Sequence, residues 1–564
     1  MKLTKTKLLL GGILILATLL RFVALDKVPV SLFGDELDVG YQAYSILKTG
    51  KDYYGNFLPI HFHSLADYRT PLYLYASVPT VAIFGISPLG VRLPAAIFGV
   101  AGIFFLYLLV KRVSRSESLA LWAAFLLTVS PWHIQYSRAA FEVTQLLFLY
   151  IAGIYFFIVG LKKPKWLALS AVLLGLTPWS YNTAKLFLPM TLVAILIIWR
   201  RELLAIPKKA LAPAAICFVL VVTPFFISTV FGGGTERFSY LSISSDPTIE
   251  GTIGFARITD NQLGFGKIGR LAHNRVLSVS EEFFNNYFQS FSSEFLFISG
   301  DVSNSRQSIQ RMGEFYKFEI VFLILGLMCL SSKIFDKRFK AFLVFWILAS
   351  PIPSALTVGG GDHATRLILM LPALVILMSV GAVMTVKMII ERWSKILLGA
   401  LGLLIGLSVL FYLHDYWIHY PWESEKLWDA GYQGAITSAV DAGAGYSKVI
   451  ISDADEPSLI YFLGWSSFSP EEFQKTPTLI PDSLPGFGDT LRLNKYYFTP
   501  IGSGQDLYKL GSILDKNTLY LATAKEIKLD LIKEPGRVPS DVKLLKAIPY
   551  PSGEGAFYLF TGTR

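Results

Sequence analysis

Residues 8–25, LLLGGILILATLLRFVAL, are the first of the apolar runs that decide the fold class. A bilayer core about 30 Å thick is spanned by a helix of roughly 20 apolar residues, and many of the runs reach this length. Lys2, Lys5 and Lys7 precede the first run, as in a signal peptide, but the run is long for such a peptide and no convincing cleavage site follows it. The run therefore predicts a retained first transmembrane helix.

The composition of the whole chain also indicates a membrane protein. Of its 564 residues, 53% are hydrophobic and 16% are charged, whereas soluble globular proteins carry roughly 25% charged residues. The net charge is +10, but Lys and Arg stand in small clusters at the ends of apolar runs rather than in one basic domain. This distribution is typical of the positive-inside bias and argues against nucleic acid as a partner.

The basic clusters predict about eleven transmembrane helices, because all of the clusters then fall on the cytoplasmic side with the N-terminus. The segment 71–85 is apolar but short and contains Pro79, so we expect it to lie at the outer interface. Large outer loops are expected at 26–91 and 231–316. The expected spans are 8–25, 92–110, 118–136, 142–161, 166–181, 184–199, 211–230, 318–332, 341–357, 366–386 and 396–413.

Two domains are expected, a transmembrane domain over 1–413 and a small extracytoplasmic α/β domain over 414–564. The second stretch is richer in Asp, Glu, Ser and Gly, and about 150 residues suffice for one domain. The chain is thus expected to be a multi-pass protein of the plasma membrane with a cytoplasmic N-terminus. The expected strands of the second domain are 448–452, 519–522 and 556–560, and a helix is expected at 457–464.

The two cysteines and the metal motifs give no sign of a structural disulfide or a metal centre. Cys217 and Cys329 both lie within apolar runs, and the chain contains no CxxC or HExxH spacing.

Ionisable residues avoid the middle of nearly every expected span and gather at the outer helix ends and outer loops. Ion-coupled transporters place such residues in mid-bilayer, where the ion must be held. The pattern therefore favours chemistry at the outer membrane–water boundary.

Asp35, Glu36 and Asp38 form the densest acidic cluster of the first outer loop. Carboxylates beside a membrane are costly unless they are solvated or paired. The cluster could cap a helix that starts at Gly34 or belong to a catalytic site, and the spacing alone leaves both explanations open.

The chain resembles glycosyltransferases of the GT-C class. In the protein O-mannosyltransferases and the bacterial enzymes that transfer aminoarabinose to lipid A, an Asp-Glu pair follows the first helix, as Asp35-Glu36 does here. Residues 69–75, RTPLYLY, are similar to the family's basic-x-Pro-Leu-Tyr-Tyr segment, and residues 91–94, VRLP, to the Arg-Leu-Pro that opens the second helix. Residues 131–142 and 363–372 are also similar to family motifs. The resemblance covers residues 1–200 and continues more weakly to about 410.

The resemblance implies a GT-C fold and a glycosyltransferase of the hexosyl or pentosyl type. It would transfer one sugar from a polyprenyl-phosphate donor to an acceptor hydroxyl at the outer face, with inversion. The acceptor could be a protein, a glycolipid or a cell-wall polymer, and membrane lipid is the other expected partner. One lipid A–modifying branch has an Arg where this chain has Asp38, which argues against carrying over that branch's phosphate ligands.

The resemblance also suggests roles for individual residues. Asp35 would remove the acceptor proton, and Glu36 would orient the acceptor or hold Asp35. The expected ligands of the leaving phosphate are Arg69, Lys185, Arg366, His363 and Arg138. The expected sugar or acceptor pocket contains Asp38, Tyr68, Tyr73, Tyr181 and Asn182.

Ordinary structural explanations stay open for these residues. The cations could be interfacial anchors or helix caps, Arg138 could pair with Glu142, and the tyrosines could belong to the aromatic belt. The scheme needs no cofactor, although a carboxylate-bound divalent ion stays possible. The rival functions are a transporter or flippase of anionic lipid-linked substrates and a polymer-assembly component. The loop 231–316 and the C-terminal domain are expected to decide acceptor choice.

Overall fold

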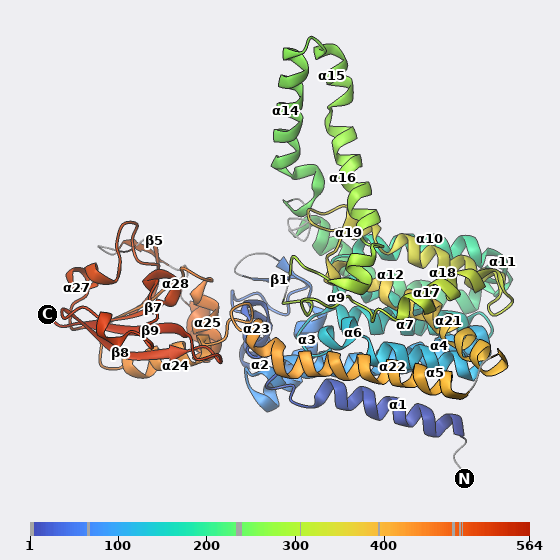
Figure 1. The fold of residues 1–564 in the computed structure, drawn as a ribbon, viewed down its shortest axis with the longest axis horizontal. Coiled ribbons are helices and arrows are strands. Elements are labelled where there is room, and N and C mark those ends of the chain that lie inside the picture. The colour runs from blue at the N-terminus through green and yellow to red at the C-terminus, as the bar shows by residue number, and fades with distance from the viewer. Residues whose placement is uncertain are drawn as a thin grey trace.

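The computed structural model describes residues 5–64, 68–232, 240–304, 306–392, 395–475, 480–483, 487 and 489–564. The chain up to Glu423 forms an array of helices, and most of the rest forms a mixed sheet with helices around it. In Figure 1 the two parts lie side by side along the long axis, and the C-terminus is at the edge far from the helical array.

The apolar runs form helices because a helix satisfies its own backbone hydrogen bonds, as the interior of a bilayer requires. Most of these helices lie side by side with similar axis directions (Figure 1). The first half contains α1 (Lys5–Phe22), α2 (Gly34–Thr49), α3 (Leu72–Phe84), α4 (Pro88–Ser114), α5 (Glu117–Val129), α6 (Pro131–Tyr136), α7 (Val143–Gly160), α8 (Lys165–Gly175), α9 (Thr177–Ser180), α10 (Ala184–Ile198), α11 (Arg200–Ala205) and α12 (Lys208–Phe231). The second half contains α14 (Pro247–Gln262), α15 (Gly266–Ala272), α16 (Arg275–Gln289), α17 (Glu319–Met328), α18 (Lys337–Ala349), α19 (Ile352–Ala355), α20 (Ala364–Leu367), α21 (Leu371–Arg392), α22 (Lys395–His414) and α23 (Tyr420–Glu423).

Within the described residues, five helical segments are long and apolar enough to cross a membrane. They are Pro88–Ser114, Val143–Gly160, Lys208–Phe231, Ala364–Ile390 and Lys395–Glu423. Four shorter helical segments are also apolar, namely Leu72–Phe84, Glu117–Val129, Ala184–Ile198 and Glu319–Ser331. Helices α1, α8 and α18 occupy three more of the expected spans. The helical fold is confirmed, whereas the number of eleven spans and their sidedness stay predictions.

The expected span 118–136 is not one continuous helix. The helix α5 ends at Val129, and α6 begins at Pro131, which has no N–H to continue the hydrogen bonds of α5. Between them, the Ser130 hydroxyl accepts a hydrogen bond from the backbone N–H of His133 and caps α6. Arg138 and Glu142 follow this break, in the segment between α6 and α7.

The expected outer loop 231–316 contains a helical hairpin made of α14, α15 and α16. It projects from the helical array, roughly at right angles to the long helices (Figure 1). Its base is attached to the array, because the Asn286 side chain donates to the backbone carbonyls of Ala355 and Thr357 over 3.4 and 3.3 Å. The Tyr287 hydroxyl donates to the carbonyl of Leu348 over 2.9 Å.

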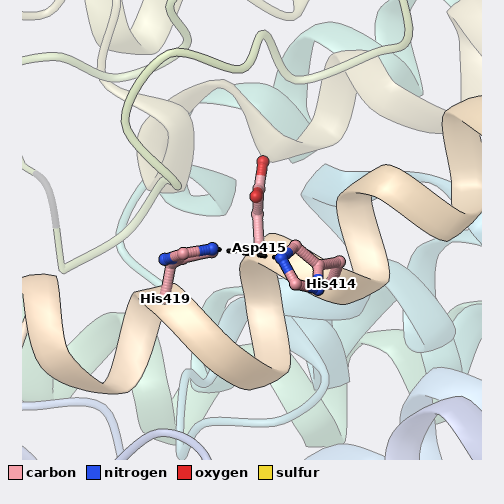
Figure 2. A group of neighbouring side chains, drawn as sticks. All are labelled: His414, Asp415 and His419. Carbon is pink, nitrogen blue, oxygen red and sulfur yellow. Dashed lines mark hydrogen bonds between the residues drawn. The ribbon is translucent and has the colours of Figure 1, made fainter.

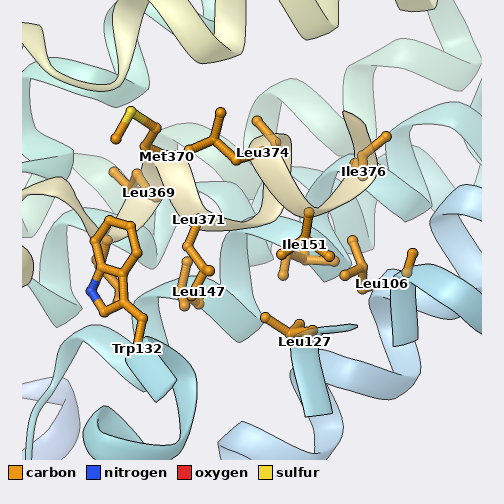
Figure 3. Close-up of a cluster of buried hydrophobic side chains, with 14 of the residues drawn as sticks. Leu106, Leu127, Trp132, Leu147, Ile151, Leu369, Met370, Leu371, Leu374 and Ile376 are labelled. Atoms are coloured by element: carbon orange, nitrogen blue, oxygen red, sulfur yellow. The ribbon is translucent and has the colours of Figure 1, made fainter. Parts of the chain in front are cut away.

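The main hydrophobic core joins helices that are far apart in the sequence. Figure 3 shows part of this core, where α21 and the turn before it meet α4, α5, α6 and α7. The side chains that meet there are buried, and Trp132 of α6 donates its indole N–H to the carbonyl of Ala364 over 3.2 Å. The N-terminal third of the chain is thereby held against the helices that precede residue 392.

The C-terminal part contains one seven-stranded sheet with the strand order β4-β5-β6-β3-β7-β9-β8. The central strand β3 pairs in parallel with β6 and β7, and the remaining pairs are antiparallel. The strands expected at 448–452, 519–522 and 556–560 are present as β3, β7 and β9. The strands are β3 (Lys448–Ile451), β4 (Ile480–Ser483), β5 (Asp489–Leu493), β6 (Tyr496–Phe498), β7 (Thr518–Thr523), β8 (Val542–Pro549) and β9 (Gly555–Gly562); the helices are α24 (Tyr432–Gly443), α25 (Ser458–Trp465), α26 (Pro470–Lys475), α27 (Leu510–Ile513) and α28 (Ala524–Ile527). The expected helix 457–464 corresponds to α25, whereas the extracytoplasmic location of this part stays a prediction.

The helix α2 joins the two parts, because it packs against α3 and α4 on one side and against α25 and α26 on another. The buried cluster around it contains side chains from both parts, including Leu37 and Leu463. The amide of Gln474 donates to Ser45, Thr49 and the carbonyl of Asp52 over 2.8–3.1 Å. The C-terminal part therefore holds the helix that carries the acidic cluster.

We expect Gly464→Ala to loosen this junction. A Cβ at Gly464 would lie 2.0 Å from Cδ2 of Leu37, which is fully buried, and such overpacking costs about 1–3 kcal/mol. The free energy of unfolding in detergent should fall by that amount. The matched control is Gly434→Ala on α24, where the nearest side-chain atom is 3.5 Å away. Equal unfolding temperatures for the two variants would contradict the close packing of α25 on α2.

Candidate active site

The acidic cluster lies at the start of α2, where Asp35 and Glu36 occupy the first turn. A helix N-terminus favours negative charge. Successive residues on a helix point in directions about 100° apart, and the two carboxylates consequently have different surroundings. The side chain of Asp35 is 67% exposed, whereas that of Glu36 is fully buried.

Glu36 is paired with Arg92 in the protein interior. Its carboxylate accepts hydrogen bonds from Nε and Nη2 of Arg92 over 2.9 and 2.6 Å and from the backbone N–H of Ala140 over 2.8 Å. Arg92 also donates to the carbonyl of Pro29 over 2.8 Å. Glu36 thus fixes the start of α2 to α4 and to the segment before α7. This position fits the expected role of holding Asp35 and not that of orienting an acceptor.

Arg69 of β2 (Tyr68–Arg69), which pairs with β1 (Phe62–His63), connects α2 to the start of α7. Its guanidinium donates to Asp38 over 3.1 Å, to the carbonyl of Asp35 over 2.9 Å and to Glu142 over 2.9 Å. Asp38 also accepts from the hydroxyl of Tyr53 over 2.9 Å. Burial raises the pKa of Asp38 to about 6, although the neighbouring Arg69 lowers it. The expected pocket residue Asp38 is therefore a partner of Arg69.

Asp35 and Arg69 border a cavity of about 410 Å³. Its walls come from α2, β2, the segment before α7, the start of α10 and the residues before it, the end of α12, the segment 231–316, and the stretch from α19 to α20. Seven of the expected site residues line it, namely Asp35, Arg69, Tyr181, Asn182, Lys185, His363 and Arg366. The other lining residues are Thr70, Phe141, Glu142, Thr183, Leu186, Thr229, Leu241, Gln307, Pro353, Thr357 and Thr365.

Besides Arg69, which contacts the acidic cluster, three basic side chains line the cavity. The Lys185 ammonium lies 5.4 Å from the ring centre of Phe225. Arg366 donates to the hydroxyl of Thr357 over 2.6 Å and to the carbonyl of Val358 over 2.9 Å. His363 begins the turn that leads to Arg366. The cavity therefore combines an exposed carboxylate with cations from distant parts of the chain.

Asp301 supports the turn that carries His363 and Arg366. Its buried carboxylate accepts from the backbone N–H of Ala364 over 2.9 Å and lies 3.8 Å from Nδ1 of His363. Burial raises the pKa of Asp301 to about 6 and also raises the pKa of its buried neighbour Glu314. Both acids stand in the long segment 231–316 without a recognisable spacing, and for that reason neither was expected in the site.

The other expected site residues lie outside the described lining of the cavity. Arg138 donates to the backbone carbonyls of Leu20, Ala24 and Val28 over 2.9–3.1 Å. It is buried against the rings of Tyr416 and Trp417. The structure thus corrects both its assignment as a phosphate ligand and the alternative pair with Glu142, which binds Arg69.

Two of the three expected pocket tyrosines lie outside the described lining of the cavity. Tyr73 is buried and donates its hydroxyl to the carbonyl of Val91 over 2.8 Å. The ring of Tyr68 lies edge-on to His63, with 4.9 Å between the ring centres. Both residues support the segment around the cavity without forming its described wall.

The sequence and the fold are similar to those of known glycosyltransferases. Residues 68–227, which include much of the cavity wall, match the family described as dolichyl-phosphate-mannose-protein mannosyltransferase. The structure is similar to that of ArnT from Cupriavidus metallidurans in the apo state, with a TM-score of 0.51 and 12% identity over 98% of this chain and 97% of that one. These matches place the chain in the GT-C glycosyltransferase superfamily.

A second solved structure similar to this GT-C protein is the archaeal oligosaccharyltransferase AglB from Archaeoglobus fulgidus, in complex with an inhibitory peptide and a dolichol-phosphate. The identity is 15% and the TM-score 0.49, over 82% of this chain. The matched region spans 63% of the length of the AglB chain. No protein in the curated comparison matches the sequence.

Glu36 and Asp35 should respond differently to replacement in this GT-C protein. We expect Glu36→Ala to lower the free energy of unfolding by about 3–5 kcal/mol, because Arg92 would stay buried without its counter-ion. Asp35→Asn should change the free energy of unfolding by less than about 0.5 kcal/mol, since Asp35 is exposed. Thermal unfolding in detergent measures both values, and a Glu36→Ala protein as stable as the wild type would contradict the buried pair.

Proposed function

We propose that the protein transfers a single sugar from a polyprenyl-phosphate donor to an acceptor hydroxyl at the outer face of the membrane. The observation that carries this proposal is the cavity in which exposed Asp35 shares the walls with Lys185, His363 and Arg366. The family match over residues 68–227 supports a lipid-phosphate-linked sugar as the donor. The size of the cavity, about 410 Å³, is at the lower end of the range of about 300–1,000 Å³ for small-ligand sites and suits one sugar and its phosphate.

Asp35 is the proposed general base. It would take the proton of the acceptor hydroxyl, whose oxygen then bonds to the anomeric carbon from the side opposite the phosphate. The bond between this carbon and the phosphate oxygen breaks, and the electron pair leaves with polyprenyl phosphate. The product has the inverted anomeric configuration. Because Asp35 is largely exposed, it can pass the proton to water and begin another cycle.

The remaining cations would stabilise the charge on the leaving phosphate. The charge of Arg69 is offset by Asp38 and Glu142, and Arg69 is therefore proposed as a positioning residue. Lys185 and Arg366 are proposed as the phosphate ligands. His363 lines the same cavity and lies 3.8 Å from the carboxylate of Asp301. Tyr181 and Asn182 line the same cavity and are proposed to contact the sugar. This scheme needs no cofactor.

We expect Asp35→Asn to lower the rate of donor consumption by about 10²–10⁴-fold, the usual contribution of a general base. The assay supplies reconstituted protein with a panel of polyprenyl-phosphate sugars and measures the release of polyprenyl phosphate. The matched control is Asp26→Asn, which changes another exposed carboxylate in the same outer segment but away from the described cavity lining. Full activity of a folded Asp35→Asn protein would show that another group is the base.

A further inference from the structure

We propose that His414, Asp415 and His419 form a binding site for a divalent transition-metal ion such as Zn²⁺. The three residues lie at the end of α22, and their potential ligand atoms are all within 4.8 Å of one another. Nε2 of His414 is 3.1 Å from Nε2 of His419. Figure 2 shows the two imidazoles approaching each other, with the Asp415 side chain rising from the turn between them.

An unusual backbone conformation brings the two histidines together. Residues Asp415–His419 form a π-helical turn, in which the N–H of Tyr420 donates to the carbonyl of Asp415, five residues earlier. In an α-helix, residues five apart point in directions about 140° apart, and the rings of His414 and His419 would diverge. The wider π-turn places them on one side. Single π-turns inside helices are rare and frequently occur at functional sites.

The ligand set indicates the kind of ion. Neutral imidazole nitrogen suits Zn²⁺, Cu²⁺ and Ni²⁺, whereas Mg²⁺ and Ca²⁺ prefer oxygen ligands throughout. Two imidazoles and one carboxylate leave at least one coordination position for water. The histidines are exposed, and an ion from the surrounding solution can reach them. These residues lie outside the lining of the cavity, and the site is therefore separate from the proposed reaction.

The inner side of the same turn is tied to the rest of the protein. Tyr416 and Tyr420 stack with 5.5 Å between their ring centres. The hydroxyl of Tyr420 donates to the carbonyl of Arg306 over 2.8 Å and accepts from the amide of Gln135 over 2.7 Å. An ion on the outer side would thus clamp the turn through which the chain leaves α22 for the C-terminal part.

Metal binding by the full-length protein tests this proposal. After treatment with a chelator, the protein in detergent is dialysed against ZnCl₂, and the bound zinc is counted. The double variant His414→Ala/His419→Ala should lose one equivalent of zinc relative to the wild type. Asp415→Asn, which keeps both imidazoles, should bind at least about tenfold more weakly. His273→Ala is the matched control, because His273 is partly exposed on the hairpin.

A thermal measurement provides a second test, because an ion that binds only the folded protein stabilises it. Added ZnCl₂ should raise the unfolding temperature of the wild type and of His273→Ala by several degrees more than that of the double variant. Equal zinc content, or an equal thermal shift, in the wild type and the double variant would overturn the proposal.

A different observation, the apolar surface of the hairpin α14–α16, carries a second inference. We infer that this hairpin lies on the outer leaflet and inserts its apolar side chains among the lipids. Phe255, Leu271 and Val276 are 75–76% exposed. The other strongly exposed apolar residues of this region are Ile258, Leu263, Phe265, Ile268, Leu277, Phe284 and Phe288. Apolar exposure on this scale marks a protein or membrane contact.

The sequence of α16 is amphipathic, as a helix at a membrane surface requires. Val276, Phe284 and Tyr287 fall on one side of the helix, within about 80° of one another, Phe288 lies at the edge of this side, and Asn285 is opposite Val276. The rings on the apolar side stack along the helix, with 6.3 Å between the centres of Phe284 and Phe288.

The position and charge of the hairpin favour lipid over a protein partner. It extends roughly at right angles to the long helices, at the end of the array that faces the C-terminal part (Figure 1). Its base lies near the ends of α18 and α19, and the helix α12 likewise exposes apolar side chains up to its last residue, Phe231. The helix α15, at the far end of the hairpin (Figure 1), carries Lys267 and Arg270, which suit anionic headgroups.

The membrane contact also bears on the proposed reaction. At the base of the hairpin Asn286 binds the carbonyl of Thr357, whose hydroxyl accepts from Arg366 in the cavity. A hairpin held on the leaflet would fix this wall of the cavity at the depth where a lipid-linked donor presents its phosphate. The contact itself does not depend on the proposed reaction and can be tested without it.

Site-directed labels measure the depth of the hairpin directly. In a C217A/C329A background, a spin label is attached to Phe284→Cys or Val276→Cys, with Asn285→Cys as the control on the opposite side of α16. The proteins are placed in nanodiscs of phosphatidylcholine and phosphatidylglycerol. Labels at 276 and 284 should be more accessible to oxygen and several-fold less accessible to a water-soluble nickel chelate than the label at 285. Equal accessibility at all three positions would overturn the inference and leave the surface to a protein partner.

Discussion

The buried guanidinium of Arg69 is the contact on which the arrangement of the cavity depends. It joins Asp38 of α2 to Glu142 before α7, two segments that are separated by more than a hundred positions in the sequence. Burying charges costs free energy unless they are paired and hydrogen-bonded, and each of these three groups therefore requires the others. The position of α2 is fixed by this requirement and by the second buried pair, Glu36 with Arg92. Asp35 remains as the one carboxylate of the acidic cluster that is largely exposed.

The sequence predicted which segments form the cavity better than it predicted which way their side chains point. Asp35, Lys185 and Arg366 were expected in the site because the resemblance implied roles for residues at the outer ends of the apolar runs, and all three line the cavity. The inward direction of Glu36 depends on where α2 begins, which a spacing of acidic residues does not determine. Arg138 binds three backbone carbonyls in the last turn of α1 and the segment after it, and such a tertiary contact leaves no local pattern.

The same limit applies to the fold. Long apolar runs and the buried strands β3, β7 and β9 were predictable, because burial on all sides gives a continuous apolar sequence. The edge strand β8 alternates Lys with apolar residues and is only half buried, and it was missed for that reason. The hairpin α14–α16 was described as a polar loop, since its apolar residues are interspersed with charged and glycine residues. The amphipathic pattern of this segment can be recognised only once the bounds of its helices are known.

The C-terminal part supports the cavity indirectly, because α25 and α26 pack against α2, which carries Asp35. The helix that carries Asp35 is thus held from two directions, whereas Lys185 and Arg366 are held by separate elements, the first turn of α10 and α20. A transfer reaction needs a base on one side of the reacting carbon and positive charge at the departing phosphate on the other. Arg69 also lies 4.0 Å from Asp35, but its charge is offset by the closer carboxylates of Asp38 and Glu142. This arrangement, with Asp35 largely exposed, favours an acid–base role for Asp35 over a structural one.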